Sequence, residues 1–116
     1  GRELGERIAA APTDRRPDGI VAANDHLACG IVFGLIASGV RVPEDIAVVG
    51  YDDIEFASVA AVPLTSVRQP AREMGRRAAE LLIARIAGDE RDGATVLFEP
   101  ELVVRASTTG ALVTAG

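Results

Sequence analysis

The sequence predicts an α/β fold built on a parallel sheet, from two apolar runs and the helical pattern between them. Residues 19–23 and 46–50 are apolar throughout, as in strands that are buried on both faces of a parallel sheet. Between them, apolar side chains recur every three or four positions from Leu27 to Ile36, which predicts a helix. Strand, helix and strand within about 30 residues form a βαβ unit, whose right-handed crossover makes the two strands parallel.

The chain opens with a predicted helix over residues 2–11. Its apolar side chains have helical spacing, and Pro12 is expected to end it. The next segment, 13–18, contains a second proline and predicts a loop that leads into the first strand.

The helix between the two strands, predicted over 27–38, carries a stripe of small residues. Gly30, Gly34 and Ser38 lie on one face of it, so we expect another backbone to approach closely there. Gly39 follows as the expected end of this helix.

A second, longer helix is predicted after a short helix at 56–61 and an extended segment at 64–67. Pro70 suits its first turn and Gly88 its end. Its apolar residues lie on one stripe, which we expect to be buried against protein. This stripe consists of Met74, Ala78, Leu81, Leu82 and Ile86.

The end of the chain predicts strand at 94–98 and 102–104, interrupted at Pro100, since proline inside a strand indicates an edge or a bulge. The tail from Thr108 is expected to be frayed.

Length and charge limit the classes of function. The 116 residues suit one domain, and a net charge of −5 without a basic cluster argues against nucleic-acid or membrane binding by this chain itself. A single cysteine, Cys29, cannot form an internal disulfide and favours a reducing compartment, so we expect a cytoplasmic protein.

The chain starts at Gly1 inside a predicted helix, which suggests a fragment. It has no visible signal peptide and no apolar run of the roughly 20 residues that a membrane helix needs.

Polar residues follow both strands of the predicted βαβ unit: Asn24 and Asp25 after the first, Asp52 and Asp53 after the second. Because parallel strands end at the same edge of a sheet, both pairs are expected at the carboxyl edge, where ligands bind in open α/β sheets. The Asn24 amide suits a sugar or nucleoside hydroxyl, although the same residue in that place is also a helix cap. The Asp52 carboxylate can accept bonds from vicinal hydroxyls, with a capping role as the alternative, whereas we expect Asp53 to be structural.

Five blocks between about residues 17 and 108 resemble the LacI/GalR family of transcriptional repressors. They are PDGIVAAND at 17–25, VPEDIAVVGYDD at 42–53, PLTSVRQP at 63–70, MGRRAA at 74–79 and PELVVR at 100–105. The resemblance implies the C-terminal part of an effector-sensing domain with the two-lobed fold of type I periplasmic binding proteins. It implies a Rossmann-like lobe here, with the DNA-binding helix-turn-helix and most of the other lobe outside this chain.

On this resemblance, residues 1–68 belong to the C-terminal lobe, 69–93 cross to the N-terminal lobe and supply a helix there, and 94–116 return. Gln69 lies in the crossing segment, where its amide either contacts the effector or bonds hinge backbone. The implied partners are a small-molecule effector, most readily a sugar, operator DNA through the missing helix-turn-helix, and a second copy of the chain. The dimer surface would lie on 27–38 and 55–60, with core packing as the alternative.

Two other classes of protein are the alternatives to this interpretation. A periplasmic sugar-binding component of a transporter has the same fold, and a signal peptide upstream of Gly1 would favour it. An α/β enzyme is disfavoured: no phosphate loop is present, and neighbouring carboxylates in one loop are not the opposed pair of a glycosidase. His26 is expected to be solvated and Cys29 to be packed, so we predict no catalytic residue, no metal site and no cofactor.

Overall fold

The computed structural model describes residues 1–88 and 95–110. They fall into two compact units, Gly1–Arg68 with Leu102–Gly116, and Gln69–Glu101. The boundary predicted at 93/94 lies outside the described residues.

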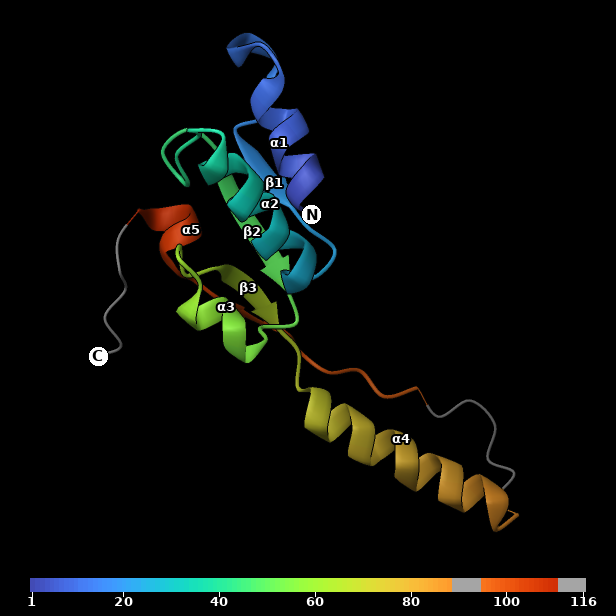
Figure 1. The fold of residues 1–116 in the computed structure, drawn as a ribbon. Coiled ribbons are helices and arrows are strands. Elements are labelled where there is room, and N and C mark those ends of the chain that lie inside the picture. Colours follow the sequence, from blue (N-terminus) through green and yellow to red (C-terminus); the bar gives the residue numbers. More distant parts are fainter. Residues whose placement is uncertain (89–94, 111–116) are drawn as a thin grey trace. The chain divides into compact units, whose positions relative to one another are not determined.

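The first unit contains most of the regular structure (Figure 1). In chain order its elements are α1 (Arg2–Ala10), a 3-10 turn (Thr13–Arg15), β1 (Gly19–Val21), α2 (Asp25–Ala37), β2 (Ala47–Tyr51), α3 (Glu55–Val59), β3 (Thr65–Arg68), β4 (Glu101–Val103) and α5 (Ala106–Thr109).

The strands form one sheet in the order β1-β2-β3-β4. β1 pairs with β2 and β2 with β3, both in parallel, so the predicted βαβ unit and its strand directions are confirmed. β4 lies beside β3, and just after it the N–H of Arg105 donates to Oγ1 of Thr65, at the start of β3. The chain therefore returns along β3 in the opposite direction.

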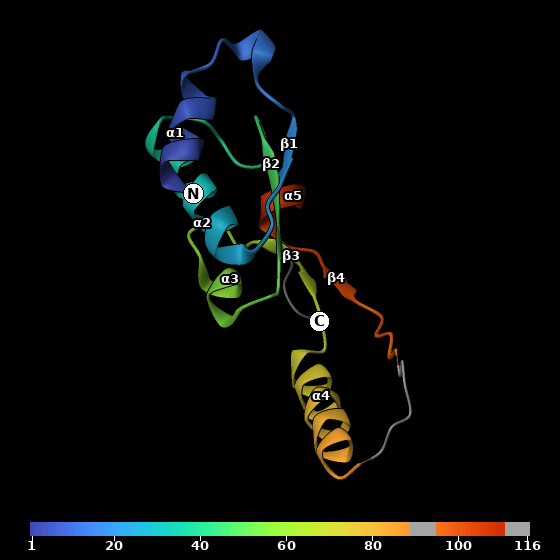
Figure 2. The same ribbon diagram turned by 90° about the vertical axis from the view of Figure 1, so that its right-hand side faces the viewer.

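The core lies between the sheet and the helices α1, α2 and α3, which cover the same side of it (Figure 2). Its largest fully buried apolar side chains are Ile31, Leu35, Ile46, Leu64 and Val48. The prediction that the first strand is buried on both faces is wrong, because Val21 is 84% exposed. β1 is an edge strand, and Val21 points to the side of the sheet opposite Ile20, which packs on the core.

α1 packs on α2 through glycine. A Cβ built on Gly34 would lie 2.3 Å from the carbonyl oxygen of Arg2, and one on Gly5 would lie 2.3 Å from that of Ile31. The predicted close approach of a backbone to the small-residue stripe of α2 is thus confirmed at Gly34.

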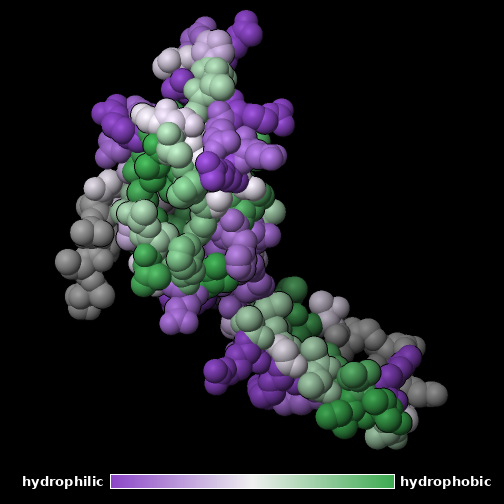
Figure 3. Space-filling view, viewed as in Figure 1, coloured by the Kyte–Doolittle hydropathy of each residue, from purple (hydrophilic) through white to green (hydrophobic). Residues whose placement is uncertain are grey.

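The described residues of the second unit contain one helix, α4 (Ala71–Ile86), and no residue of this helix is buried. The stripe is therefore not buried within this chain: Met74, Leu82 and Ile86 are 38%, 62% and 79% exposed. Its burial against a neighbouring chain stays a prediction. Apolar surface gathers toward the C-terminal end of α4 (Figure 3). No described residue belongs to a helix that is long and apolar enough to cross a membrane.

The predicted strand at 94–98 is not formed at 95–98, and residue 94 lies outside the described part of the chain. The frayed tail is also wrong as far as Thr109, because Thr108 and Thr109 belong to α5. Oγ1 of Thr108 lies 2.7 Å from Oγ1 of Thr65, which ties this short helix to β3.

Candidate functional site

Asn24 and Asp52 lie at the same, carboxyl edge of the parallel sheet. Val21 in β1 is the register partner of Val49 in β2, and each of the two polar residues follows three positions later. The topology thus brings together the two residues that the sequence analysis selected, at the edge where open α/β sheets bind ligands.

Asn24 is the N-cap of α2. Its Oδ1 accepts a hydrogen bond from the N–H of Leu27 at 2.9 Å, which satisfies one of the free donors of the first turn. The side chain is exposed, and its Nδ2 has no partner within residues 1–88 and 95–110. The capping role is therefore confirmed, and the amide hydrogens stay available as donors.

The loop after β2 has an unusual backbone conformation. Asp52 and Asp53 have φ angles of 104° and 52°, in the region that side chains rarely adopt and that costs about 1–3 kcal/mol per residue. The N–H of Asp52 donates to the carbonyl oxygen of Val67 at 2.9 Å, and that of Asp53 to Oγ of Ser66 at 3.0 Å. These bonds from β3 hold the loop in its strained form.

Asp53 is a structural ion-pair centre. Its side chain is 5% exposed, Nε of Arg68 lies 2.7 Å from Oδ2, and Nη1 of Arg105 lies 2.6 Å from Oδ1. The contact to Arg105 is an ion pair without the geometry of a regular hydrogen bond. Burial would raise the pKa of the Asp53 carboxyl, but the two guanidinium groups outweigh it, and the pKa lies below its ordinary value. The structural role expected for Asp53 is confirmed.

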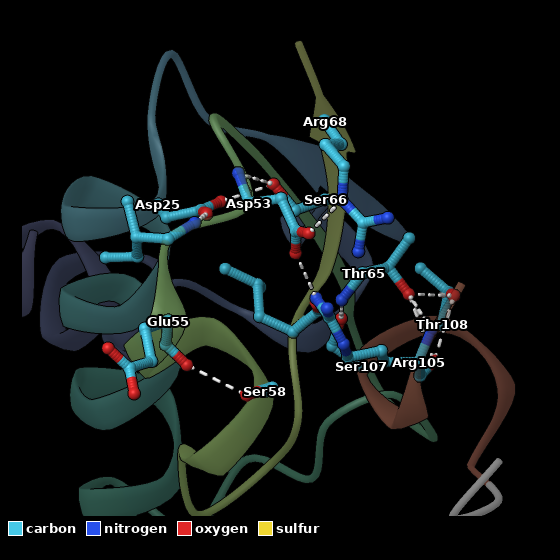
Figure 4. Close-up of polar contacts among 12 residues, drawn as sticks. Asp25, Asp53, Glu55, Ser58, Thr65, Ser66, Arg68, Arg105, Ser107 and Thr108 are labelled. Atoms are coloured by element: carbon cyan, nitrogen blue, oxygen red, sulfur yellow. Dashed lines mark hydrogen bonds and ion pairs between the residues drawn. The ribbon is translucent and has the colours of Figure 1, made fainter. Parts of the chain in front are cut away.

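A fully buried carboxylate, Asp25, connects α2 to this loop (Figure 4). Its Oδ2 accepts from the N–H of Ile54 at 2.8 Å, and its Oδ1 accepts from the hydroxyl of Ser66 at 2.6 Å. Gly50 provides the space, since a Cβ there would lie 2.1 Å from Oδ1 of Asp25. Hydrogen bonds of this kind offset part of the cost of burying the carboxylate.

The remaining candidates lie elsewhere or have other roles. Gln69 is the first residue of the second unit and is half-buried. His26 is exposed, as expected, and Cys29 packs against the core. Burial, and then the Asp25 carboxylate, raise the pKa of the Cys29 thiol. Across the described ranges, no three His, Cys, Asp or Glu residues lie together in a way that could hold a metal ion.

Ser66, Arg68 and Arg105 were not predicted as site residues from the sequence, and Asp25 was predicted without a role of its own. One local signal was available: Gly50 lies inside β2, and glycine inside a strand often indicates close approach of another group. The partners of Asp25 could not be identified from its neighbours in the sequence, because Ile54 and Ser66 lie 29 and 41 positions away from it.

Comparison with known proteins gives evidence that is independent of this geometry. Residues 2–108 match the family described as periplasmic binding protein-like domain. The HTH-type transcriptional repressor PurR of Aliivibrio fischeri (strain ATCC 700601 / ES114) is 36% identical over 107 residues, which are 92% of this chain and 32% of that protein. The chain thus spans about a third of the length of this curated relative.

Two solved structures are similar over nearly the same residues. A complex of the transcriptional regulator CelR with cellobiose has a TM-score of 0.77 and 42% identity, covering 91% of this chain and 33% of that one. The lac repressor dimer, bound to operator and the anti-inducer ONPF, has a TM-score of 0.80 and 32% identity, covering 92% and 36%.

Proposed function

The chain belongs to the periplasmic binding protein-like domains of LacI-family transcriptional regulators, and from this we propose that Asn24, Asp52 and Gln69 contact a small polar effector. Effector binding, not catalysis, is the role of this domain in the family. The observation that carries the proposal is the parallel register of β1 and β2, which leaves Asn24 and Asp52 at one ligand-binding edge.

The chemistry of the two side chains favours a sugar. The Asn24 amide has donors left over after capping α2, and the Asp52 carboxylate offers only acceptors. A hydroxyl group both donates and accepts, so adjacent hydroxyls of a sugar suit this pair. The cellobiose complex of CelR supports the same class of ligand. Purine bases are the alternative, because amides and carboxylates also bind base edges.

Within a longer regulator, we assign the first unit to the C-terminal lobe and the helix of Gln69–Glu101 to the N-terminal lobe. The effector would change the balance between two arrangements of the lobes, as far as it binds them with different affinity. That change would alter operator binding by a DNA-binding segment outside this chain, since a net charge of −5 suits no DNA contact here. Such a regulator acts in the cytoplasm.

A dimer of such regulators would use α2 and α3. Four large apolar side chains on these helices are exposed by 42–72%: Phe33, Ile36, Phe56 and Val59. Apolar surface covers the part of the first unit where α2 and α3 lie (Figure 3). Exposed apolar surface of this kind is typical of protein interfaces, and the dimeric lac repressor supports the proposal.

The test uses the intact natural protein that contains residues 1–116. Its melting temperature is measured with cellobiose, glucose, sucrose, adenine and guanine, since a ligand at 100 times its Kd stabilises the folded state by about 2.7 kcal/mol. We expect a sugar to raise the melting temperature and Asp52→Asn to abolish the shift. Asp18→Asn, an exposed carboxylate at the opposite edge of the sheet, is the matched control and should keep it. A shift that survives both Asp52→Asn and Asn24→Ala would contradict the proposed site.

A further inference from the structure

One buried carboxylate joins the two segments that carry the proposed effector contacts. Asp25 directly follows Asn24 at the start of α2, and its side chain is fully buried. Both of its oxygens bond groups from other elements: the N–H of Ile54 in the loop after β2, and the hydroxyl of Ser66 in β3. The partners are a main-chain N–H and a hydroxyl, so this carboxylate orients neighbouring groups instead of balancing a cation.

These bonds also help to hold the loop that carries Asp52 in one conformation. Three successive main-chain N–H groups have partners on fixed elements: that of Asp52 bonds Val67, that of Asp53 bonds Ser66, and that of Ile54 bonds Asp25. Ser66 is a relay, since its hydroxyl donates to Asp25 and accepts from Asp53 (Figure 4). Ser66 and Asp25 therefore hold this loop at Asp53 and Ile54, and the main chain of β3 holds it at Asp52.

We propose that Asp25 and Ser66 are positioning residues, which set effector affinity by fixing the distance between Asn24 and Asp52 without contacting the effector. The inference rests on the effector role proposed for that pair. Main-chain continuity ties Asn24 to Asp25, and the hydrogen bonds tie Asp25 to the loop of Asp52. A binding site whose contacting groups lie on two segments keeps its affinity only when the segments are held together.

The sharpest test compares two serines. Ser66 and Ser107 are both fully buried, and each hydroxyl donates one hydrogen bond and accepts one. Ser107 bonds Thr65 and Val48, away from the loop. Ser66→Ala and Ser107→Ala therefore remove the same group at the same burial, and only the first one reaches the loop of Asp52.

The experiment measures effector affinity by calorimetry in the intact natural protein, with the five compounds of the panel above as probes. We expect Ser66→Ala to weaken binding about 10- to 100-fold, by analogy with the loss seen when residues that orient metal ligands are removed. Ser107→Ala should lower the melting temperature to a similar extent and leave affinity within about twofold. Asp25→Asn should give an intermediate loss of affinity, because its amide oxygen still accepts from the N–H of Ile54.

A second measurement needs no effector and serves if Ser66→Ala does not fold. Amide hydrogen exchange at Asp53 and Ile54 should be faster in Asp25→Asn than in the wild type, because a neutral amide binds the Ile54 N–H and the Ser66 hydroxyl more weakly than the carboxylate does. Exchange in the core of α2 should be unchanged. Wild-type exchange rates at both amides would overturn the inference, as would equal losses of affinity in Ser66→Ala and Ser107→Ala.

The direct variants separate this inference from the proposed function. If Asn24→Ala and Asp52→Asn bind as the wild type does, the proposed site is wrong and the positioning role falls with it. If both lose affinity while Asp25→Asn and Ser66→Ala keep it, the proposed function stands and the positioning role is refuted.

Discussion

Replacing Gly34 by alanine is expected to destabilise the first unit, although alanine is the better helix former. A Cβ at this position would lie 2.3 Å from the carbonyl oxygen of Arg2 and 2.9 Å from the main-chain nitrogen of Glu6. Both obstacles are backbone atoms of α1, so no rotation of a side chain relieves them. The two helices must move apart by about 1 Å locally, which weakens their van der Waals contacts.

The net effect follows from two opposing contributions. Alanine in place of glycine inside a helix stabilises by about 1 kcal/mol. Overpacking a close contact costs about 1–3 kcal/mol, and a rigid backbone obstacle favours the upper end of that range. The difference is a loss of about 2 kcal/mol in the free energy of unfolding. In a domain of this size, each kcal/mol lowers the melting temperature by about 4–8 °C, so a decrease of roughly 8–16 °C is expected.

The assay is thermal unfolding followed by far-ultraviolet circular dichroism, with Gly75→Ala as control. Gly75 lies inside α4, and a Cβ there meets no atom within 4 Å. Helix propensity alone then acts, and the control should gain helical signal. A melting temperature for Gly34→Ala equal to or above that of the wild type would refute the close packing of α1 on α2.

Three further changes test the charges and surfaces of the first unit. Asp53→Asn should lower the urea midpoint by an amount equivalent to about 2–4 kcal/mol, because Arg105, 16% exposed, loses its counter-charge; an unchanged midpoint would argue against the ion pair. The pKa of the Asp53 carboxyl is below its ordinary 3.8 in the folded state, so its stabilisation is complete above about pH 4 and is lost as the pH falls through the folded pKa. Acid titration should therefore destabilise the wild type more steeply than Asp53→Asn, and equal slopes would count against this assignment. Cys29 should react slowly with iodoacetamide at neutral pH, since burial and Asp25 raise its pKa, and Asp25→Asn should shift its rate profile to lower pH. Phe56→Asp should shift sedimentation of the intact natural protein toward the monomer if α3 lies in the proposed dimer interface, and an unaffected dimer would exclude α3 from it.

The sequence predicted the parts of the fold that depend on local patterns. The apolar runs at 19–23 and 46–50 with a helix between them were enough for the parallel pairing of β1 and β2. That pairing places Asn24 and Asp52 at one edge. The stripe at Gly30 and Gly34 also predicted the approach of another backbone, because a helix places such residues on one face.

The predictions that failed, or that this chain leaves open, concern what lies against an element. An apolar sequence does not distinguish a strand at the edge of a sheet from one in its centre. Val21 was expected to be buried, but it lies in the edge strand β1 and is exposed. The stripe of α4 is apolar in sequence, but no residue of that helix is buried in this chain. The relay from Asp25 through Ser66 has no local pattern either, because the fold alone brings these residues together.

Arg68 and Arg105 both bind Asp53, which holds together the points where the chain leaves the first unit and returns to it, so we expect the first unit to fold without residues 69–100. The chain leaves the first unit after Arg68 and re-enters it at Leu102, and strands β3 and β4, which end and begin there, are neighbours in the sheet. A short turn could therefore replace the removed segment without stretching β3 or β4. The Asp53 carboxylate would still bind Arg68 before the junction and Arg105 after it. The shortened protein would keep Asn24 and Asp52 at the carboxyl edge of the sheet and lack Gln69, so it would measure effector binding by the first unit alone.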